Sequence, residues 1–355
     1  MSGFESISDQ KQPIRILTSL FQNGAVPHAL LFTGIEGVGK KTCAIAFAML
    51  CNCLKKRHIP GDQAEVDFSA SIDGYFINPC GSCRSCRKIE SANHPDIILI
   101  KPVGAFLKVE QIRDLGDIIA MKPYEAKIRV VIISDAQRMT PGAGNALLKS
   151  LEEPPEGTIF ILTANQISDL IPTIVSRCRH IRFNPIPLKS ITDMLVAKLL
   201  LDPESSKVIA SLANGSFSKA LKMGANNKVN WIKHRKWLLT AVARNCFAGD
   251  SPDAVAEPYG LIFALADKLS GNKDLLFESL EIIKTWFRDI AVYKYSPDKV
   301  INIDMIKSIK FASEKFSIKS ISSKVKAIHK AQKNILANAN LRTTLDVLML
   351  RLAGA

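Results

Sequence analysis

A glycine-rich octapeptide near the N-terminus, Gly34 to Lys41, has the residue types of a phosphate-binding loop. Its sequence, GIEGVGKK, follows the apolar run HALLFT and precedes KKTCAIAFAML, as a loop between a strand and a helix would. Gly34, Gly37 and Gly39 would let backbone amides converge on phosphate oxygens, and Lys40 could reach the terminal phosphates. The pattern predicts a nucleotide-binding fold, with a glycine turn that binds no ligand as the alternative.

The residues that would hold Mg²⁺ beside this loop depart from what hydrolysis requires. A hydroxyl directly after the loop lysine and an acidic residue at the end of a later strand usually hold the ion. Lys41 stands in place of the hydroxyl and has only donors, while Thr42 comes one position too late. The later strand RVVIISD ends in a single acid, Asp135, where two adjacent acids are expected. We therefore expect no efficient ATP hydrolysis, and whether ATP or ADP binds stays open.

Three cysteines in the segment NPCGSCRSCRK, Cys80, Cys83 and Cys86, have a spacing that brings three thiolates around one metal ion. A disulfide framework is a poor explanation because no secretion signal is recognisable. An iron–sulfur run would need a cysteine at position 90, where Glu90 stands. We predict a structural zinc site whose fourth ligand comes from a set of three residues. These are Cys53, Cys51 and His58.

The first half of the chain alternates apolar runs with helical patterns, which is typical of a parallel sheet covered by helices. The segment KVEQIRDLGDIIAMK has an apolar stripe at helical spacing. Two prolines in NPIPLKS mark a domain boundary near residue 186, and amphipathic helices follow to the C-terminus. The predicted strands are residues 28–34, 96–102, 129–135, 158–164 and 179–183.

Length and charge restrict the class of protein. A chain of 355 residues predicts two or three domains. Its formal net charge of +14 favours a polyanionic partner, with simple solubility as the alternative. No apolar run approaches the roughly 20 residues of a membrane span, and no signal core is present. We expect a cytoplasmic protein without a membrane partner.

Residues 128–178 carry a resemblance to a known family. The motifs NALLKSLEEPP and SRC within this segment resemble those of the AAA+ clamp-loader ATPases, bacterial and eukaryotic. The resemblance implies an α/β fold made of three parts. These are an AAA+ P-loop domain with a parallel five-stranded sheet and a zinc-binding insertion (1–185), a small helical lid (186–226) and an all-α C-terminal collar that mediates oligomerisation (227–355).

The resemblance also assigns roles to single residues. Counting back from Asn145, the family's Walker-B aspartate falls on Ser134 and its glutamate on Asp135. In GSFSKAL, Ser218 takes the position of a sensor arginine. Relatives take their first zinc cysteine thirteen positions after the loop lysine, which from Lys40 reaches Cys53, so Cys53 is preferred and Cys51 is second choice.

Arg177 of the SRC motif takes the place of the family's arginine finger, which projects into a neighbouring subunit's ATP site in trans. A planar fork of donors can stabilise the charge that accumulates on the γ-phosphate during phosphoryl transfer. The alternative is an arginine that bonds carbonyls at a helix C-terminus. If Arg177 is a finger, a chain without its own catalysis still holds a catalytic residue.

Within the family, the sequence is most similar to those members of the bacterial DNA polymerase III clamp loader whose nucleotide site is degenerate. This resemblance implies a rigid stator in a five-membered ring with the ATPase subunits and a delta subunit. The sliding clamp and primed DNA would be reached through the assembly. The alternatives are an ATPase-active motor subunit and a free-standing nucleic-acid-binding protein with a vestigial loop.

A lysine-rich tract covers residues 307–333. The lysines are ordinary solvated side chains, or they face acidic neighbours or template DNA. Their positions are 307, 310, 315, 319, 324, 326, 330 and 333.

Overall fold

The computed structural model describes most of the chain. The described ranges are residues 3–55, 77–225, 231–247, 258–271, 273–302, 305–337 and 339–354. The chain divides into two compact units, of which the first comprises Met1–Met194 with Ala213–Leu221 and the second Leu195–Leu212 with Lys222–Ala355. The three-domain division at residues 185 and 226 stays a prediction.

The first unit is built on a parallel sheet of five strands in the order β2-β3-β4-β1-β5. Leu31 of β1 pairs with Leu162 of β4 and with His180 of β5. All five strands predicted from the sequence are present in the described residues, so the predicted α/β fold class is confirmed. The strands are β1 (Ala29–Thr33), β2 (Ile97–Ile100), β3 (Arg129–Ile133), β4 (Thr158–Ala164) and β5 (Arg179–Arg182).

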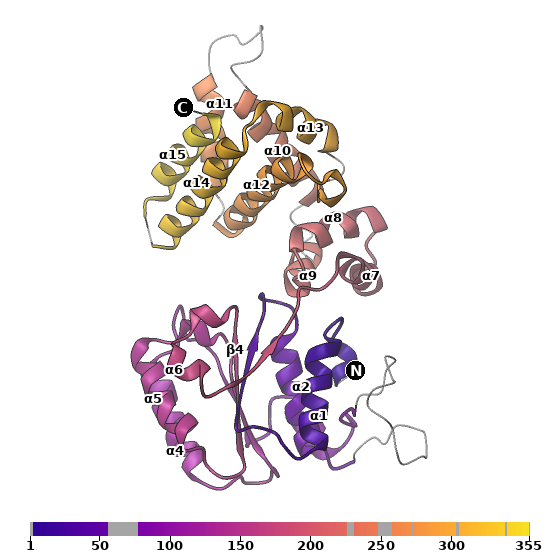
Figure 1. Ribbon diagram of the computed structural model, residues 1–355, viewed down its shortest axis with the longest axis vertical. Coiled ribbons are helices and arrows are strands. Elements are labelled where there is room, and N and C mark those ends of the chain that lie inside the picture. The colour runs from indigo at the N-terminus through magenta and orange to yellow at the C-terminus, as the bar shows by residue number, and fades with distance from the viewer. Residues whose placement is uncertain are drawn as a thin grey trace. The chain divides into compact units, whose positions relative to one another are not determined.

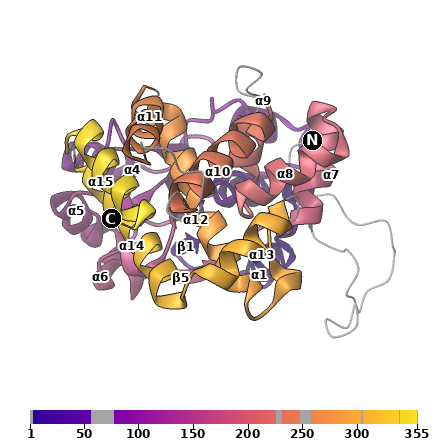
Figure 2. The same cartoon turned by 90° about the horizontal axis from the view of Figure 1, so that it is seen from above.

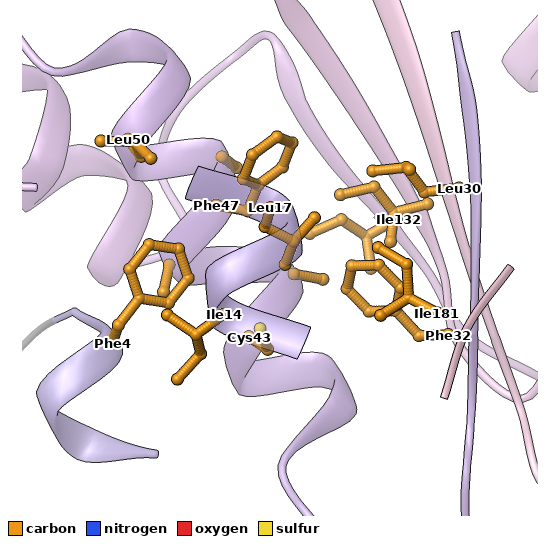
Figure 3. Packing of buried hydrophobic residues seen from close by; sticks show 14 of the residues in the cluster. Phe4, Ile14, Leu17, Leu30, Phe32, Cys43, Phe47, Leu50, Ile132 and Ile181 are labelled. Carbon is orange, nitrogen blue, oxygen red and sulfur yellow. The ribbon is translucent and has the colours of Figure 1, made fainter. Parts of the chain in front are cut away.

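Helices cover both faces of this sheet, with α1 and α2 on one side and α4, α5 and α6 on the other (Figure 1). Every residue of β1, β3 and β4 is buried, because these strands are apolar on both faces. On the side of α1 and α2, Leu17 and Phe47 pack against Phe32 and Ile132 of the sheet (Figure 3). The helices of this unit are α1 (Lys11–Gln22), α2 (Lys40–Asn52), α3 (Arg84–Glu90), α4 (Val109–Ala120), α5 (Pro141–Glu152) and α6 (Pro172–Val175).

Helix α4 shows how the sequence pattern becomes structure. It begins after Lys108, whose backbone N–H donates to Oε1 of Gln111 at 3.1 Å and so satisfies an otherwise unpaired donor. Ile112, Leu115 and Ile119 form its buried stripe. The expected helix over residues 108–122 is therefore present and is slightly shorter at both ends.

Beyond residue 187 the described residues are helical, as the sequence pattern predicts. Of the short 3-10 segments in the described residues, three precede residue 187 and one follows it. They are η1 (Phe4–Ser6), η2 (Ala136–Arg138), η3 (Ile167–Asp169) and η4 (Pro297–Lys299). The remaining helices are α7 (Leu188–Leu199), α8 (Pro203–Ala213), α9 (Phe217–Ala225), α10 (Trp231–Phe247), α11 (Pro258–Ser270), α12 (Lys273–Tyr293), α13 (Ile306–Lys315), α14 (Ile318–Leu336) and α15 (Leu341–Ala353). Among the helices that the structure describes, none combines the length and apolar character needed to cross a membrane.

The buried carboxylate of Asp96, directly before β2, organises the turn that follows α4. Its Oδ1 accepts a hydrogen bond from the backbone N–H of Tyr124 at 2.8 Å. Its Oδ2 accepts from Glu125 at 2.8 Å and from Ala126 at 2.9 Å, and Nη2 of Arg129 lies 3.4 Å from Oδ1. Burial by itself would raise the pKa of Asp96, but these donors outweigh it and lower the pKa below its usual range.

We expect Asp96→Asn to lower the free energy of unfolding by about 2–4 kcal/mol at pH 7, because three backbone donors lose a charged acceptor. A carboxylate with a depressed pKa stabilises the fold above its unfolded pKa of about 3.9 and loses this effect as the pH falls through the folded pKa. The difference between variant and wild type should therefore shrink at acid pH, as urea denaturation at a series of pH values would measure. Asp117→Asn, an exposed acid of α4, is the matched control. An equal loss in both variants would contradict the role of Asp96.

Candidate functional site

The glycine-rich loop lies between β1 and α2, where the sequence places it. Gly39 caps α2 with a left-handed backbone (φ 100°), and its carbonyl accepts the N–H of Cys43 at 2.8 Å. Gly34 needs its missing side chain, because a Cβ there would lie 2.6 Å from the carbonyl oxygen of Phe183. The backbone therefore forms a glycine-rich strand–loop–helix junction, a geometry that binds phosphate in P-loop proteins.

The lysine of this loop is engaged by the loop itself. Nζ of Lys40 donates to the carbonyl of Gly34 and, at 3.0 Å, to that of Ile35. The residue is 7% exposed. Burial lowers the pKa of Lys40, and the charges of Asp135 and Glu36 oppose that shift. The ammonium that could contact terminal phosphates is thus bonded to protein carbonyls.

The tip of the loop contacts the start of α9. The carbonyl of Gly37 accepts hydrogen bonds from the backbone N–H groups of Phe217 at 3.1 Å and Ser218 at 3.4 Å. A Cβ at Gly37, where φ is +83°, would lie 2.3 Å from Oγ of Ser216. The segment that carries Ser218, at the predicted sensor position, therefore packs directly on the loop. Neither Gly37 nor the serines at positions 216 and 218 indicated this contact in the sequence.

Of the residues at the positions where Mg²⁺ would be held, Lys41 and Asp135 lie close enough to interact electrostatically. Burial and the neighbouring ammonium of Lys101 lower the pKa of Lys41, whereas the carboxylate of Asp135 raises it. Thr42 is exposed. The hydroxyl of Ser134 is buried and, within the described residues, has no hydrogen-bond partner. The ammonium of Lys41 thus lies near the carboxylate of Asp135.

Arg177 lies between α6 and β5 and is half-buried. Its Nη2 forms an ion pair with Oε1 of Glu152 at 2.7 Å. Its Nη1 donates to the carbonyl of Thr173, in α6, at 3.0 Å and to Oγ of Ser176 at 3.3 Å. The carbonyl contact is the one expected of an arginine at a helix C-terminus, and the guanidinium is held at the protein surface. The partner Glu152 was not singled out from the sequence, although it lies in the LEEPP motif.

Four cysteines converge at the C-terminal end of α2. The sulfur atoms of Cys53, Cys80, Cys83 and Cys86 all lie within 4.8 Å of one another, and all four residues are buried. The Sγ atoms of Cys80 and Cys86 are 4.0 Å apart. Cys51 instead belongs to the hydrophobic core that includes Leu17 of α1 and Phe47 of α2. The structure therefore brings Cys53, the preferred fourth ligand, to the other three, and His58 lies outside the described residues, as does most of the 54–79 insertion.

The cysteine cluster fits a tetrahedral metal. Backbone N–H groups donate hydrogen bonds to its sulfur atoms. The N–H of Cys80 donates to Sγ of Cys53 and the N–H of Cys83 to Sγ of Cys80, both at 3.3 Å. The N–H of Cys86 donates to Sγ of Cys83 at 3.4 Å. Burial alone would raise the pKa of Cys80, but the N–H groups of Cys83 and Ser82 outweigh it and lower the pKa to about 6. Four thiol ligands leave no open position for substrate, as in structural zinc sites.

Comparison with known proteins agrees with this geometry. Residues 9–187 match the family model described as "DNA polymerase III, delta subunit", and residues 253–352 match "DNA polymerase III, delta subunit, C terminal". The chain is 28% identical to DNA polymerase III subunit delta' of Bacillus subtilis, over 97% of this chain and 96% of that protein. It is also 28% identical to subunit tau of the same organism, over 83% of this chain and 51% of tau.

Among solved structures, a gamma subunit-related protein of Thermotoga maritima is similar over 97% of this chain and 99% of its own. The TM-score is 0.42 and the identity 16%. The sequence matches, and not this likeness, identify the family of the chain.

The parallel sheet with a glycine-rich loop between β1 and α2 defines the class: an AAA+-type P-loop protein with a helical C-terminal part. The chain belongs to the DNA polymerase III delta-subunit family. The clamp-loader members with a degenerate nucleotide site, to which the sequence was predicted to be most similar, are the delta-prime subunits, and the Bacillus subtilis match confirms this resemblance.

Proposed function

We propose that this clamp-loader subunit of DNA polymerase III is a stator that does not hydrolyse ATP. It helps to load the sliding clamp onto primed DNA and supplies Arg177 to the ATP site of a neighbouring ATPase subunit. Its partners are the ATPase subunits and a delta subunit in a five-membered ring. The P-loop domain (1–185), lid (186–226) and collar (227–355) divide these tasks, and zinc held by four cysteines stabilises the first.

One observation carries the proposal that the chain lacks its own ATPase. Nζ of Lys40 donates to carbonyls of its own loop, and the next residue along α2 is Lys41, a second ammonium near Asp135. Mg²⁺ needs oxygen ligands at this place, and an ammonium excludes the ion by charge and offers no lone pair. We therefore infer that, among the described residues of this loop and its neighbours, there is no position for the Mg²⁺ that ATP hydrolysis needs.

Reconstitution of the clamp loader with and without this chain tests the function. We expect loading of the clamp onto primed DNA only when the chain is present, and no turnover of ATP by the chain alone. Equal loading in its absence would contradict the stator role. A turnover of about 1 s⁻¹ or more by the isolated chain, abolished by Lys40→Ala, would instead establish an ATPase-active motor subunit.

A further inference from the structure

A groove with a basic end lies between α14 and α15, two helices of the second unit. Figures 1 and 2 both draw these helices side by side near the C-terminus. The groove consists of two adjoining depressions of about 500 Å³ and about 260 Å³. Both are lined by Ala327, Lys330 and Arg351, so they form one continuous surface feature.

The larger depression is lined by cations and hydroxyls. Beside Lys330 and Arg351 it is lined by Lys324, Lys326 and the two serines Ser320 and Ser323. Lys326, Lys330 and Arg351 are exposed. Among the described residues, none that lines it is acidic. The depression therefore presents three exposed cations and two serine hydroxyls to an anionic ligand, with Lys324 buried beneath them.

The cation at the floor of this depression is held in place by the fold. Lys324 is 5% exposed, and its Nζ donates to the carbonyl of Leu352. The same ammonium lies 5.2 Å from the centre of the Phe316 ring. A lysine fixed in this way loses little further side-chain freedom when a ligand binds.

Acidic residues that could neutralise the groove are absent from the helices that form it. Helix α14 contains five lysines and no Asp or Glu. The one acid of α15, Asp346, pairs with Arg342 at 3.2 Å. The positive charge of the groove therefore calls for carboxylates or phosphates supplied by another molecule.

The smaller depression has a different character. Its lining includes the apolar side chains of Ala331, Val347 and Leu348, and Val347 is 45% exposed. The hydroxyls of Thr343 and Thr344 also line it, and because both already donate to Asn340 they are left to accept a hydrogen bond from a backbone N–H or another donor. Among the residues that the structure describes, no aromatic side chain lines either depression. Sites for single-stranded nucleic acid combine a positive groove with aromatic rings on which bases stack. This groove has the positive charge but not the aromatic rings.

We propose that the groove between α14 and α15 binds an acidic peptide segment of a partner protein. Carboxylates of the segment contact Lys326, Lys330 and Arg351, and an apolar side chain beside them packs on Val347. Charge complementarity selects the acidic segment, and the apolar end of the groove favours peptide over nucleic acid. The inference is independent of the ATP site.

The test uses the full chain and two fluorescent probes in the same low-salt buffer. One probe is the labelled peptide Asp-Glu-Leu-Asp-Glu-Leu-Asp-Glu, and the other is a labelled 20-nucleotide oligo-dT. The test variant is Lys330→Glu/Arg351→Glu. The matched control is Lys319→Glu/Lys333→Glu, which reverses two exposed lysines of α14 outside the groove. Thermal unfolding of each variant confirms that it is folded.

We expect the peptide to bind, its Kd to weaken about tenfold or more in the test variant, and by less than about twofold in the control. Val347→Ser should weaken it by about threefold. No measurable peptide binding to the wild type, or equal weakening in both double variants, would overturn the proposal. Tighter binding of oligo-dT than of peptide, lost in the test variant alone, would overturn it in favour of nucleic acid.

Discussion

Replacing Arg177 with alanine is expected to lower the DNA-stimulated ATPase rate of the assembled clamp loader by about 10³-fold at the site that this residue reaches. In the role that we propose, the guanidinium supplies charge and several donors to the γ-phosphate in the transition state, and water cannot substitute for them in a closed site. Folding of the chain should be intact, because Arg177 is half-buried at the surface.

The contacts of Arg177 in the free chain allow this role. An ion pair between exposed side chains contributes about 0.2–1 kcal/mol, so the pair with Glu152 costs little to break when a phosphate is offered instead. The bond to the carbonyl of Thr173 is also at the surface. If Arg177 acts in trans as we propose, Glu152 and the carbonyl of Thr173 are the partners that it exchanges for the phosphate.

Steady-state ATPase assays on reconstituted loaders measure the effect. Arg179→Ala, two residues away and exposed on β5, is the matched control and should behave like wild type. Arg177→Lys should lose most of the rate, since one ammonium does not replace a planar fork. An assembly containing Arg177→Ala that hydrolyses ATP at the wild-type rate would show that the residue only caps α6.

The sheet was predictable because each strand carries its own signal. Ile132 and Ile161 belong to apolar runs of strand length, and such runs indicate strands buried on both faces. The strand order could not be read from these runs, since any of them pairs equally well with any other. The order was therefore not predicted, and only the structure shows that β4 lies between β1 and β3.

The candidate site was predictable in residue type but not in contacts. Spacing alone groups Cys80, Cys83 and Cys86, since C-x₂-C turns bring neighbouring thiols together. The fourth cysteine depends on where α2 ends, and spacing alone left Cys53 and Cys51 open. The bonds from Lys40 to its own loop depend on backbone geometry that single-residue patterns do not encode. Glu152, the last residue of α5, was missed for the same reason, because its residue type does not indicate which side chain it pairs with.

We expect the purified chain to contain about one equivalent of zinc, and Cys86→Ser to abolish binding and lower the free energy of unfolding by about 3 kcal/mol or more. Cys86 is fully buried, so its variant leaves a polar hydroxyl where a thiolate completed the tetrahedron. For a unit of this size the loss corresponds to roughly 6–12 °C in Tm. Metal analysis and thermal unfolding measure the two effects.

Cys51→Ser separates loss of metal from loss of packing. Cys51 is as buried as the ligands, at 5% exposed, but it packs in the core with Leu17 and Phe47 rather than with the cysteine cluster. Its variant should lose some stability and keep one equivalent of zinc. Removal of the metal by a chelator should then destabilise wild type and Cys51→Ser alike, and leave Cys86→Ser unchanged. Less than half an equivalent of zinc in the wild type would contradict the site. Equal zinc content in Cys51→Ser and Cys86→Ser would also contradict it, because only the loss of a metal ligand should lower the zinc content.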